Sequence, residues 1–210
     1  KRKSELKALQ SQINPHFLYN TLDSIIWMAE GRKYEEVVLM TASLARLLRQ
    51  SISNEDEVVP LAREVEYAKG YLTIQKMRYK DKLEFEIDVE PSILNIPLIK
   101  LVLQPIIENA IYHGLKYKES KGLLQVKGFM KDGNAVLQVI DNGVGMDEET
   151  LSHIYDKHKV NYHSNGVGVY NVQKRLQLYY GESYGITYES EKGVGTTATI
   201  TIPGIQEESI

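Results

Sequence analysis

Residues 141–146 have the sequence Asp-Asn-Gly-Val-Gly-Met and follow directly on an apolar strand predicted over residues 135–140. A carboxylate at a strand end can accept a hydrogen bond from the amino group of an adenine ring, and neighbouring glycines let the backbone approach that ring closely. Two more glycine pairs follow, at residues 166–168 and 193–195. Each pair alone suits a tight turn equally well, and neither the Rossmann nor the P-loop spacing is present.

The segments around this stretch predict a domain of helices and strands. Alternating apolar residues indicate half-buried strands, over residues 83–89, 123–130, 135–140, 184–190 and 196–202. A very apolar helix is expected over residues 97–113, interrupted at Pro105, and the glycines at 166 and 168 open another helix. We therefore expect an α+β sandwich over residues 81–203, with helices on one side of a sheet.

The first 53 residues predict two amphipathic helices joined as a hairpin. Asn14 can cap one helix with Pro15 at its first position, and Gly31 suits its end. A lone hairpin buries little apolar surface, so we expect two copies to form a dimeric four-helix bundle. After a polar break at 53–57, a further helix ends near Tyr79. The predicted domains are residues 1–59, the hairpin, and 60–210, in which 60–80 form an entry helix.

Composition excludes several classes of function. The chain has 210 residues with a net charge of −3, so no basic field for nucleic acid is present. It has no cysteine, which excludes thiolate zinc sites and cysteine nucleophiles. No apolar run reaches the ~18–20 residues of a membrane span, so we expect no direct membrane contact. Because the chain starts at Lys1 without a methionine, we expect it to be part of a longer protein.

Two further clusters carry groups that suit phosphoryl chemistry. His16 and Asn20 are four residues apart and share one face of a helix, and a neutral imidazole is a good nucleophile toward phosphorus. Taken alone, His16 is more readily interpreted as an ordinary histidine that packs or hydrogen-bonds in the bundle. Within residues 104–114, Asn109 offers an amide oxygen of the kind that Mg²⁺ prefers, and Glu108 and His113 flank it. An ordinary core helix with a polar edge is the alternative for that segment.

In their order along the chain, these motifs resemble the bacterial two-component sensor histidine kinases, and more narrowly the LytS/YesM-like subgroup. The motifs are NPHFLYN at 14–20, ENAIYHG at 108–114, DNGVGM at 141–146, NGVGVYN at 165–171 and GVGTT at 193–197. The resemblance implies a dimerisation and phosphotransfer hairpin followed by the ATP-binding sandwich shared with gyrase, the Hsp90 chaperones and MutL. It also implies ATP and Mg²⁺ as ligands, and a partner response regulator whose receiver aspartate takes the phosphoryl group.

The resemblance assigns a role to individual residues. His16 would be the phosphorylated histidine, and Asn20 would stand where related kinases keep a residue used in dephosphorylating the regulator. Asn109 would bind Mg²⁺ and Asp141 the adenine amino group. The remaining expected nucleotide-binding residues are His113, Gly143 and Gly145, Gly166 and Gly168 beside the phosphates and lid, and Thr196 or Thr197 near the adenine. The chain would be the cytoplasmic portion of a membrane-anchored bacterial receptor.

Some assignments stay open. Phe17 stands where many histidine kinases have an acidic base, which leaves Glu108 as the candidate. Tyr112 stands where a Lys or Arg often meets phosphate, and Lys116 or Lys118 could take that part. The alternative functions are a non-catalytic dimerising module with a degenerate nucleotide site, or another ATPase built on the same sandwich.

Overall fold

The computed structural model describes residues 13–52, 56–155 and 166–205. The chain divides into two compact units, the first formed by residues 1–57 and 66–80 and the second by residues 58–65 and 81–210. The division falls inside one helix, α4 (Leu61–Tyr79). The domain boundary at residues 59 and 60 stays a prediction.

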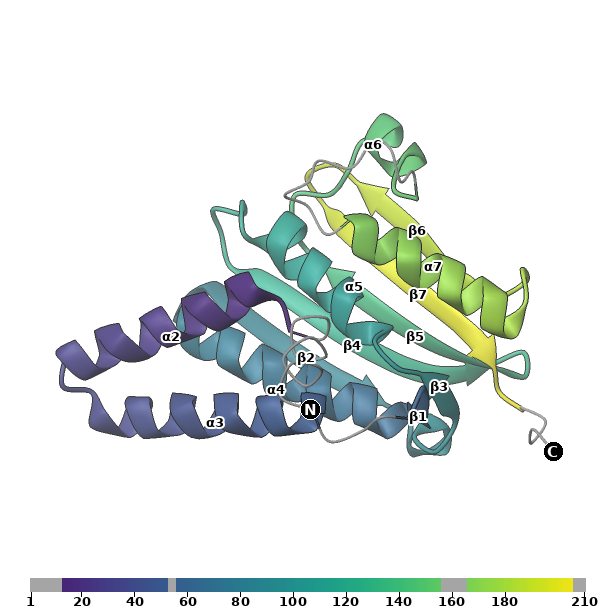
Figure 1. Cartoon of the computed structure of the whole chain (residues 1–210). Helices are drawn as coiled ribbons and strands as arrows, with labels where there is room; N and C mark the ends of the chain where they lie inside the picture. Colours follow the sequence, from purple (N-terminus) through teal and green to yellow (C-terminus); the bar gives the residue numbers. More distant parts are fainter. Residues whose placement is uncertain (1–12, 53–55, 156–165, 206–210) are drawn as a thin grey trace. The chain divides into compact units, whose positions relative to one another are not determined.

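The first unit contains the predicted helical hairpin, α2 (Pro15–Glu30) and α3 (Tyr34–Ile52), drawn in purple to blue in Figure 1. The predicted caps are confirmed. Asn14 Oδ1 accepts a hydrogen bond from the backbone N–H of His16 at 2.9 Å, with Pro15 at the first helical position. Gly31 N donates to Trp27 O at 2.9 Å where α2 ends. Both ends of α2 are therefore fixed by residues next to them in sequence.

The rest of the first unit is the larger part of α4, which packs on the hairpin. The rings of Phe17 and Tyr71 have centroids 4.8 Å apart, and both side chains are buried. Gly70 leaves room for Leu47, because a Cβ at Gly70 would lie 3.2 Å from Leu47 Cδ1. Phe17, directly after His16, is thus a core residue of this unit.

The second unit is built on a five-stranded sheet in the order β2-β4-β5-β7-β6, in which only the β2–β4 pair is parallel. The strands are β2 (Leu83–Val89), β4 (Gly122–Lys131), β5 (Asn134–Asp141), β6 (Gly185–Glu191) and β7 (Gly195–Pro203). Each lies within one residue of its prediction at either end. A separate two-stranded sheet pairs β1 (Val58–Pro60) with β3 (Pro97–Ile99). The short 3₁₀ turns are η1 (Lys80–Lys82) and η2 (Pro91–Ile93).

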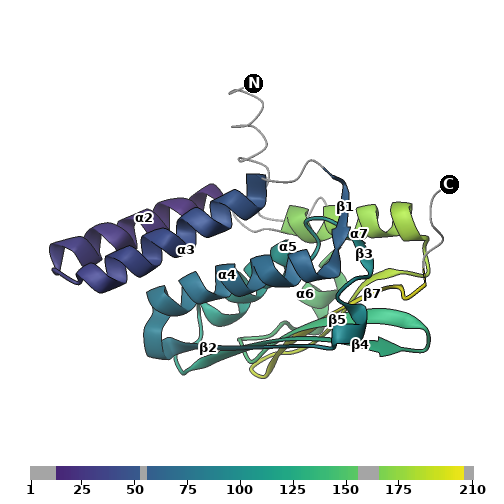
Figure 2. The ribbon, with the colours of Figure 1, turned by 90° about the horizontal axis from the view of Figure 1, so that it is seen from below.

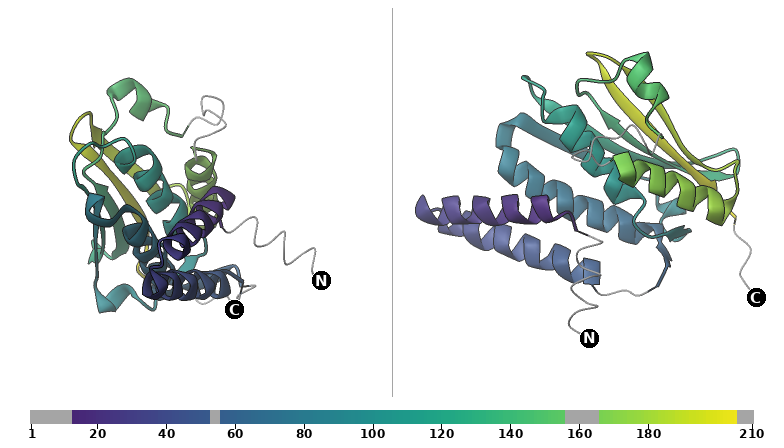
Figure 3. Two further views of the ribbon diagram at one scale, coloured as in Figure 1. Left: turned by 90° about the vertical axis from the view of Figure 1, so that its left-hand side faces the viewer. Right: turned by 45° about the horizontal axis from the view of Figure 1, so that its top comes forward.

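Two helices lie side by side on one face of the five-stranded sheet, α5 (Leu103–Asn109) and α7 (Gly166–Tyr180), as Figures 1 and 2 show. A π-helical turn, η3 (Ala110–Leu115), continues α5, and the short α6 (Glu148–Ser152) lies between β5 and α7 in sequence. The right-hand view of Figure 3 shows the same layering of α5 and α7 over the sheet. The predicted α+β sandwich is confirmed.

One helix prediction was wrong in its bounds. Residues 97–99 form β3, and the helix expected over 97–113 begins only at Leu103. Pro105 does not interrupt it, because it lies in the first turn, where backbone N–H groups have no partner within the helix. Of the helices in the described ranges, none is both long and apolar enough to cross a membrane.

Candidate functional site

The strand register places a row of cavity-lining side chains on the helix-covered face of the sheet. Val139 of β5 pairs with Ala198 of β7, which pairs with Tyr188 of β6. Two residues further along, Asp141 pairs with Thr196. Because side chains alternate between faces with a period of two, these residues point to the same side. All five line a cavity of about 740 Å³.

Asp141 is the buried acid of this cavity, with 6% of its surface exposed. Its Oδ1 accepts a hydrogen bond from Gly143 N at 2.9 Å. Burial raises the pKa of Asp141 to about 6, against the opposing effect of the backbone N–H groups of Gly143 and Thr196. The backbone therefore holds the carboxyl group in place, while burial disfavours its ionised form. A ligand that donates a hydrogen bond to the carboxylate would stabilise that ionised form.

The backbone approaches Asp141 closely from η3. A Cβ at Gly114 would lie 2.7 Å from Asp141 Oδ1, and a Cβ at Gly143 would meet the Gly114 carbonyl. Val144 N donates to that same Gly114 oxygen at 3.0 Å. Gly114 and Gly143 are therefore required for packing, and Gly143 does not line the cavity.

Two polar atoms from α5 and η3 are buried without a hydrogen-bond partner in the described structure, Asn109 Oδ1 and His113 Nε2. Both residues line the cavity. Desolvation, and secondarily the charge of Lys116, lowers the pKa of His113, so its imidazole favours the neutral form. Buried polar atoms are normally paired, so these two indicate a ligand that supplies their partners.

Glu108 is buried beside the cavity but does not line it. Its Oε1 accepts a hydrogen bond from Gln104 Nε2 at 2.9 Å, one helical turn earlier. Burial raises the pKa of Glu108 to about 7, and the bond from Gln104 opposes that rise. Near neutral pH this carboxyl group can therefore take up or release a proton.

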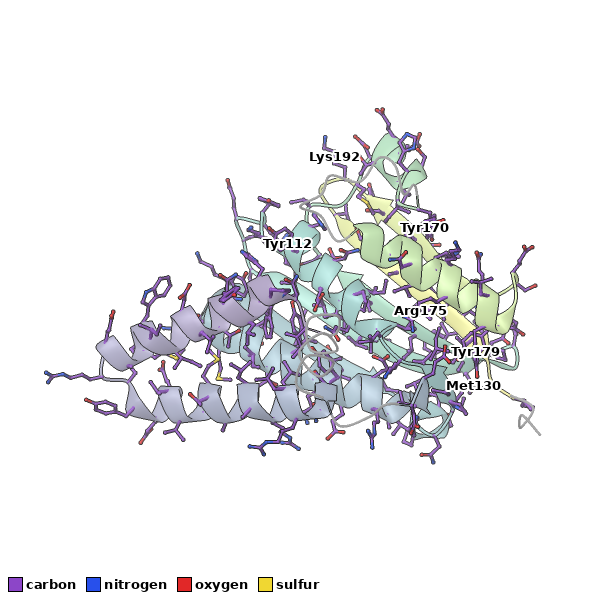
Figure 4. The ribbon with its side chains drawn as sticks, in the orientation of Figure 1. Tyr112, Met130, Tyr170, Arg175, Tyr179 and Lys192 are labelled. Carbon is purple, nitrogen blue, oxygen red and sulfur yellow. The ribbon has the colours of Figure 1, made fainter. Side chains whose placement is uncertain are left out.

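The rim of the cavity includes residues of α6 and of the segment before it. Met146 lines the cavity, and its N–H donates to Ser190 Oγ at 2.8 Å. Ser190 Oγ lies 2.7 Å from Thr196 Oγ1, which ties this rim to the strand pair β6–β7. Tyr112 also lines the cavity, and Lys116 Nζ lies 4.3 Å from the centre of its ring. Figure 4 labels Tyr112 at the end of the α5–η3 segment.

The structure brings together part of the predicted nucleotide set. Asn109, His113, Asp141, Gly145 and Thr196 line the cavity. Thr197 instead lines a smaller depression, of about 410 Å³, because its side chain points to the other face of the sheet. Gly166 and Gly168 open α7, as expected, but it is Val169 that lines the cavity. The resemblance also implies a lid over residues 146–165, and the second half of that range, residues 156–165, lies outside the described residues.

Several lining residues are absent from the sequence prediction. Val139 and Ala198 lie two residues from Asp141 and Thr196 on the same strands, so the alternation of strand side chains was the signal that could have found them. Tyr188 has no such signal, because its place depends on the β6–β7 register. Its hydroxyl is buried; burial raises the pKa of Tyr188, and a side-chain hydrogen bond with Asn109 opposes that rise.

The histidine motif lies in the first unit. His16 is exposed in the first turn of α2, and Asn20 Nδ2 lies 3.2 Å from its Nδ1. The amide and the imidazole are therefore in contact on one helix face, as the four-residue spacing predicts.

A mixed sheet covered on one face by two helices, with a cavity that holds a buried carboxyl group and unpaired amide and imidazole atoms, defines a ligand-binding sandwich domain. The family model described as histidine kinase-, DNA gyrase B- and HSP90-like ATPase matches residues 95–206 of it. The chain belongs to this ATPase family. A second model, described as histidine kinase, matches residues 4–83.

Known relatives narrow the class to sensor histidine kinases. The chain is 37% identical over 202 residues to the sensor histidine kinase YesM of Bacillus subtilis, covering 96% of this chain and 34% of the relative. It is 33% identical over 186 residues to the sensor protein LytS of Oceanobacillus iheyensis, covering 86% of this chain and 31% of the relative. The chain thus spans about a third of the length of these relatives. The LytS/YesM-like resemblance is confirmed.

Solved structures show the same fold. The histidine kinase domain of the blue-light activated kinase of Erythrobacter litoralis EL346 aligns with a TM-score of 0.53 at 17% identity, over 95% of this chain and 93% of that one. The mycobacterial sensor histidine kinase MprB aligns with a TM-score of 0.50 at 22% identity, over 70% of this chain and 96% of that one. Membership of an ATPase family implies ATP as the ligand class of the cavity.

Proposed function

We propose that this chain is the kinase region of a sensor histidine kinase, which binds ATP in the cavity of the second unit and transfers its γ-phosphoryl group to His16. The observation that carries the proposal is the cavity itself, in which the buried Asp141 carboxyl group accompanies the unpartnered Asn109 Oδ1 and His113 Nε2. The exposure of His16 supports its part as the acceptor.

Asp141 would select the base of the nucleotide. Its carboxylate can accept a hydrogen bond from an exocyclic amino group, whereas a carbonyl oxygen at that place would be repelled. Val139 and Ala198 lie two residues from Asp141 and Thr196 on the same strands, and they offer an apolar surface against which the flat ring of a base can pack. Adenine combines an amino group with a flat ring and is therefore the preferred base.

Asn109 would hold Mg²⁺ through its amide oxygen. This assignment fits the chain, because Asn109 Oδ1 is buried in the cavity without a partner and amide oxygens are hard ligands. When bound, Mg²⁺ supplies charge neutralisation on the phosphate oxygens. At the phosphate end, the backbone amides that open α7 at Gly166 and Gly168 can donate to phosphate, and Lys116 can add positive charge.

At His16, phosphorylation forms a bond between an imidazole nitrogen and the γ-phosphorus while the bond from that phosphorus to the ADP oxygen breaks. The proton on the ring leaves to a base. Asn20, in contact with Nδ1, would orient the ring, and the same amide would position water during dephosphorylation. Glu108 remains the candidate base, supported by its pKa of about 7 and its place next to Asn109.

A second copy of this chain is the expected partner of the hairpin. Several large apolar side chains on α2 and α3 are exposed, namely Leu22, Ile26, Trp27, Tyr34, Val38 and Leu39. Trp27 is 70% exposed. Apolar residues gathered on two adjacent helices favour pairing into a four-helix bundle.

From phosphorylated His16, the phosphoryl group would pass to a receiver aspartate of a response regulator. The whole protein would be a membrane-anchored receptor with this region in the cytoplasm.

The test is incubation with γ-labelled ATP and Mg²⁺ of the chain and of two variants, His16→Gln and Asn109→Ala. We expect acid-labile, alkali-stable label on the unaltered chain and none on either variant. ADP binding is measured in parallel to distinguish the causes of the lost label in the two variants. His16→Gln should leave ADP binding unchanged, whereas Asn109→Ala should weaken it in the presence of Mg²⁺. Label that survives His16→Gln would overturn the assignment of His16. Absence of both binding and label would instead favour a non-catalytic module.

A further inference from the structure

The helix that carries Asn109 has no capping residue of its own. The residue before α5 is Val102, and no side chain from its own segment accepts a hydrogen bond from the first amides. Helix starts normally use Ser, Thr, Asp or Asn for this, because the first four backbone N–H groups lack partners within the helix. A buried helix start without such a partner is unfavourable, so another group is required here.

Glu64, in the first turn of α4, supplies that group. Its Oε1 accepts a hydrogen bond from Val102 N at 3.1 Å, and the side chain is only 6% exposed. Burial raises the pKa of Glu64 to about 7, and the opposing effects are the amides of Val102, Leu101 and Leu103 and the charge of Arg175. The carboxyl group therefore faces the amides of three consecutive residues at the start of α5.

The loop before α5 is held from its other side by α7. Arg175 Nη2 donates to Lys100 O at 2.6 Å, and Nη1 donates to Leu101 O at 3.3 Å. Leu101 has φ +61°, a left-handed conformation that residues other than glycine seldom adopt. Figure 4 shows Arg175 beside α7, on the side toward β3. Such a conformation persists where surrounding contacts fix it, and here Glu64 and Arg175 do so.

The first turn of α4 belongs to the second unit and is held within it by backbone hydrogen bonds. Leu61 N donates to Ile96 O at 2.9 Å, and Ala62 N donates to Leu94 O at 2.8 Å. Directly before Leu61, strand β1 is paired with β3, and Pro60 lies opposite Pro97. Glu64 therefore extends from a fixed backbone, as a positioning residue must.

We infer that Glu64 positions the nucleotide cavity from α4: by holding the amides at residues 101–103, it fixes the start of the helix that ends in Asn109. The inference rests on the proposed function in taking a nucleotide as the ligand. Helix α5 is seven residues long, so a shift at its start is passed to Asn109 over two helical turns. If α5 is correctly placed in only a fraction of the protein molecules, the apparent affinity for the nucleotide falls in proportion to that fraction.

The test distinguishes the effect of side-chain length at residue 64 from the effect of its negative charge. Glu64→Gln keeps the length of the side chain and an acceptor oxygen, whereas Glu64→Asp keeps the charge and shortens the side chain by one methylene. We expect the Asp variant to bind Mg²⁺–ADP about tenfold more weakly in a calorimetric titration of the whole chain, since a buried amide loses its partner. We expect the Gln variant to bind within about twofold of the unaltered chain, since its oxygen still reaches Val102 N.

Glu66 provides the matched control two residues further along α4. It is exposed, and its Oε1 lies 3.9 Å from Arg46 Nη2. Glu66→Asp and Glu66→Gln are expected to leave ADP affinity unchanged. Amide hydrogen exchange over residues 101–109 should accelerate in Glu64→Asp alone, which reports the cap directly.

Equal affinity in Glu64→Asp and the unaltered chain would overturn the inference, as would a loss in Glu64→Gln as large as that in Glu64→Asp. If the unaltered chain bound no ADP, the proposed function would fail. The exchange rates at residues 101–109 would then decide the role of Glu64 by themselves.

Discussion

At the scale of single residues, Asp141 combines its proposed role in nucleotide binding with a cost in stability. Its pKa is about 6 in the folded chain against an ordinary value of 3.8, so folding favours the protonated form. The stability that this group contributes is complete below pH 3.8 and is lost as the pH rises through 6. At neutral pH the ionised carboxyl group therefore destabilises the fold that it serves.

Asp141→Asn is expected to stabilise the chain and to weaken nucleotide binding. At pH 8 the neutral amide avoids the cost of a buried charge, which should raise the free energy of unfolding by about 1–3 kcal/mol. Affinity for ADP should fall by about 100-fold, because a buried hydrogen bond to a charged group is lost. Denaturant unfolding and ADP titration at pH 5 and pH 8 measure both effects.

Asp147 provides the control for this prediction. It is exposed at the start of α6, where its Oδ1 accepts a hydrogen bond from Thr150 N at 2.8 Å. Asp147→Asn keeps a capping side chain and should alter ADP affinity little. A loss of stability in Asp141→Asn at pH 8 would contradict the account of its buried charge.

Glu108→Gln tests the candidate base. The amide keeps the size of the side chain and can still accept from Gln104, so ADP affinity should stay within about twofold. Autophosphorylation should fall by about 100-fold or more, the usual contribution of a general base. In the unaltered chain the rate should rise with pH through about 7, the pKa of Glu108, and this rise should vanish in the variant. An unchanged rate would remove Glu108 from the mechanism.

Residue types and order were enough to place Asn109, His113 and Asp141 in one cavity, but not to decide between Thr196 and Thr197. That choice depends on which face of β7 the helices cover, and only Thr196 lines the cavity. Glu64 gave no signal at all in the sequence. Its partner Val102 is 38 residues away, and the contact exists only in the folded chain.

At the scale of elements, the start of α2 is defined locally. Asn14→Ala removes the acceptor for His16 N and should destabilise the first unit by about 1 kcal/mol. Thermal unfolding followed by circular dichroism measures this change. Asn14→Asp retains an acceptor oxygen and should restore most of the lost stability. Equal stability in the Ala and Asp variants would show that the cap contributes nothing.

Elements with local signals were predicted and those that depend on distant pairing were missed. The Asn14-Pro15 cap, the Gly31 end of α2 and the alternation in β2 each depend on residues only a few positions apart. By contrast, β1 and β3 have three residues each and form only by pairing across about forty positions. The π-helical turn at 110–115 also has no sequence signal, since the hydrophobic pattern of α5 runs through it unchanged.

At the scale of the whole molecule, the exposed apolar face of the hairpin predicts self-association. Ile26→Lys places a charge on that face and should convert a dimer to a monomer in light scattering after size-exclusion chromatography. Asp88→Lys, an exposed position on β2 of the second unit, is the control for the added charge and should leave the mass unchanged. A chain that is already monomeric at micromolar concentration would contradict the proposed bundle.

Because the chain divides into its two units inside α4, the length of this helix cannot vary freely. In a loop, an inserted residue is absorbed locally. In a helix, each inserted residue turns everything that follows by about 100° and advances it by about 1.5 Å. Natural insertions and deletions should therefore be rare between Leu61 and Tyr79, and multiples of seven residues should be the least disruptive ones there. A chimaera with another sensor is best joined before α2, so that α2, α3 and α4 stay together and the phase of α4 is left intact.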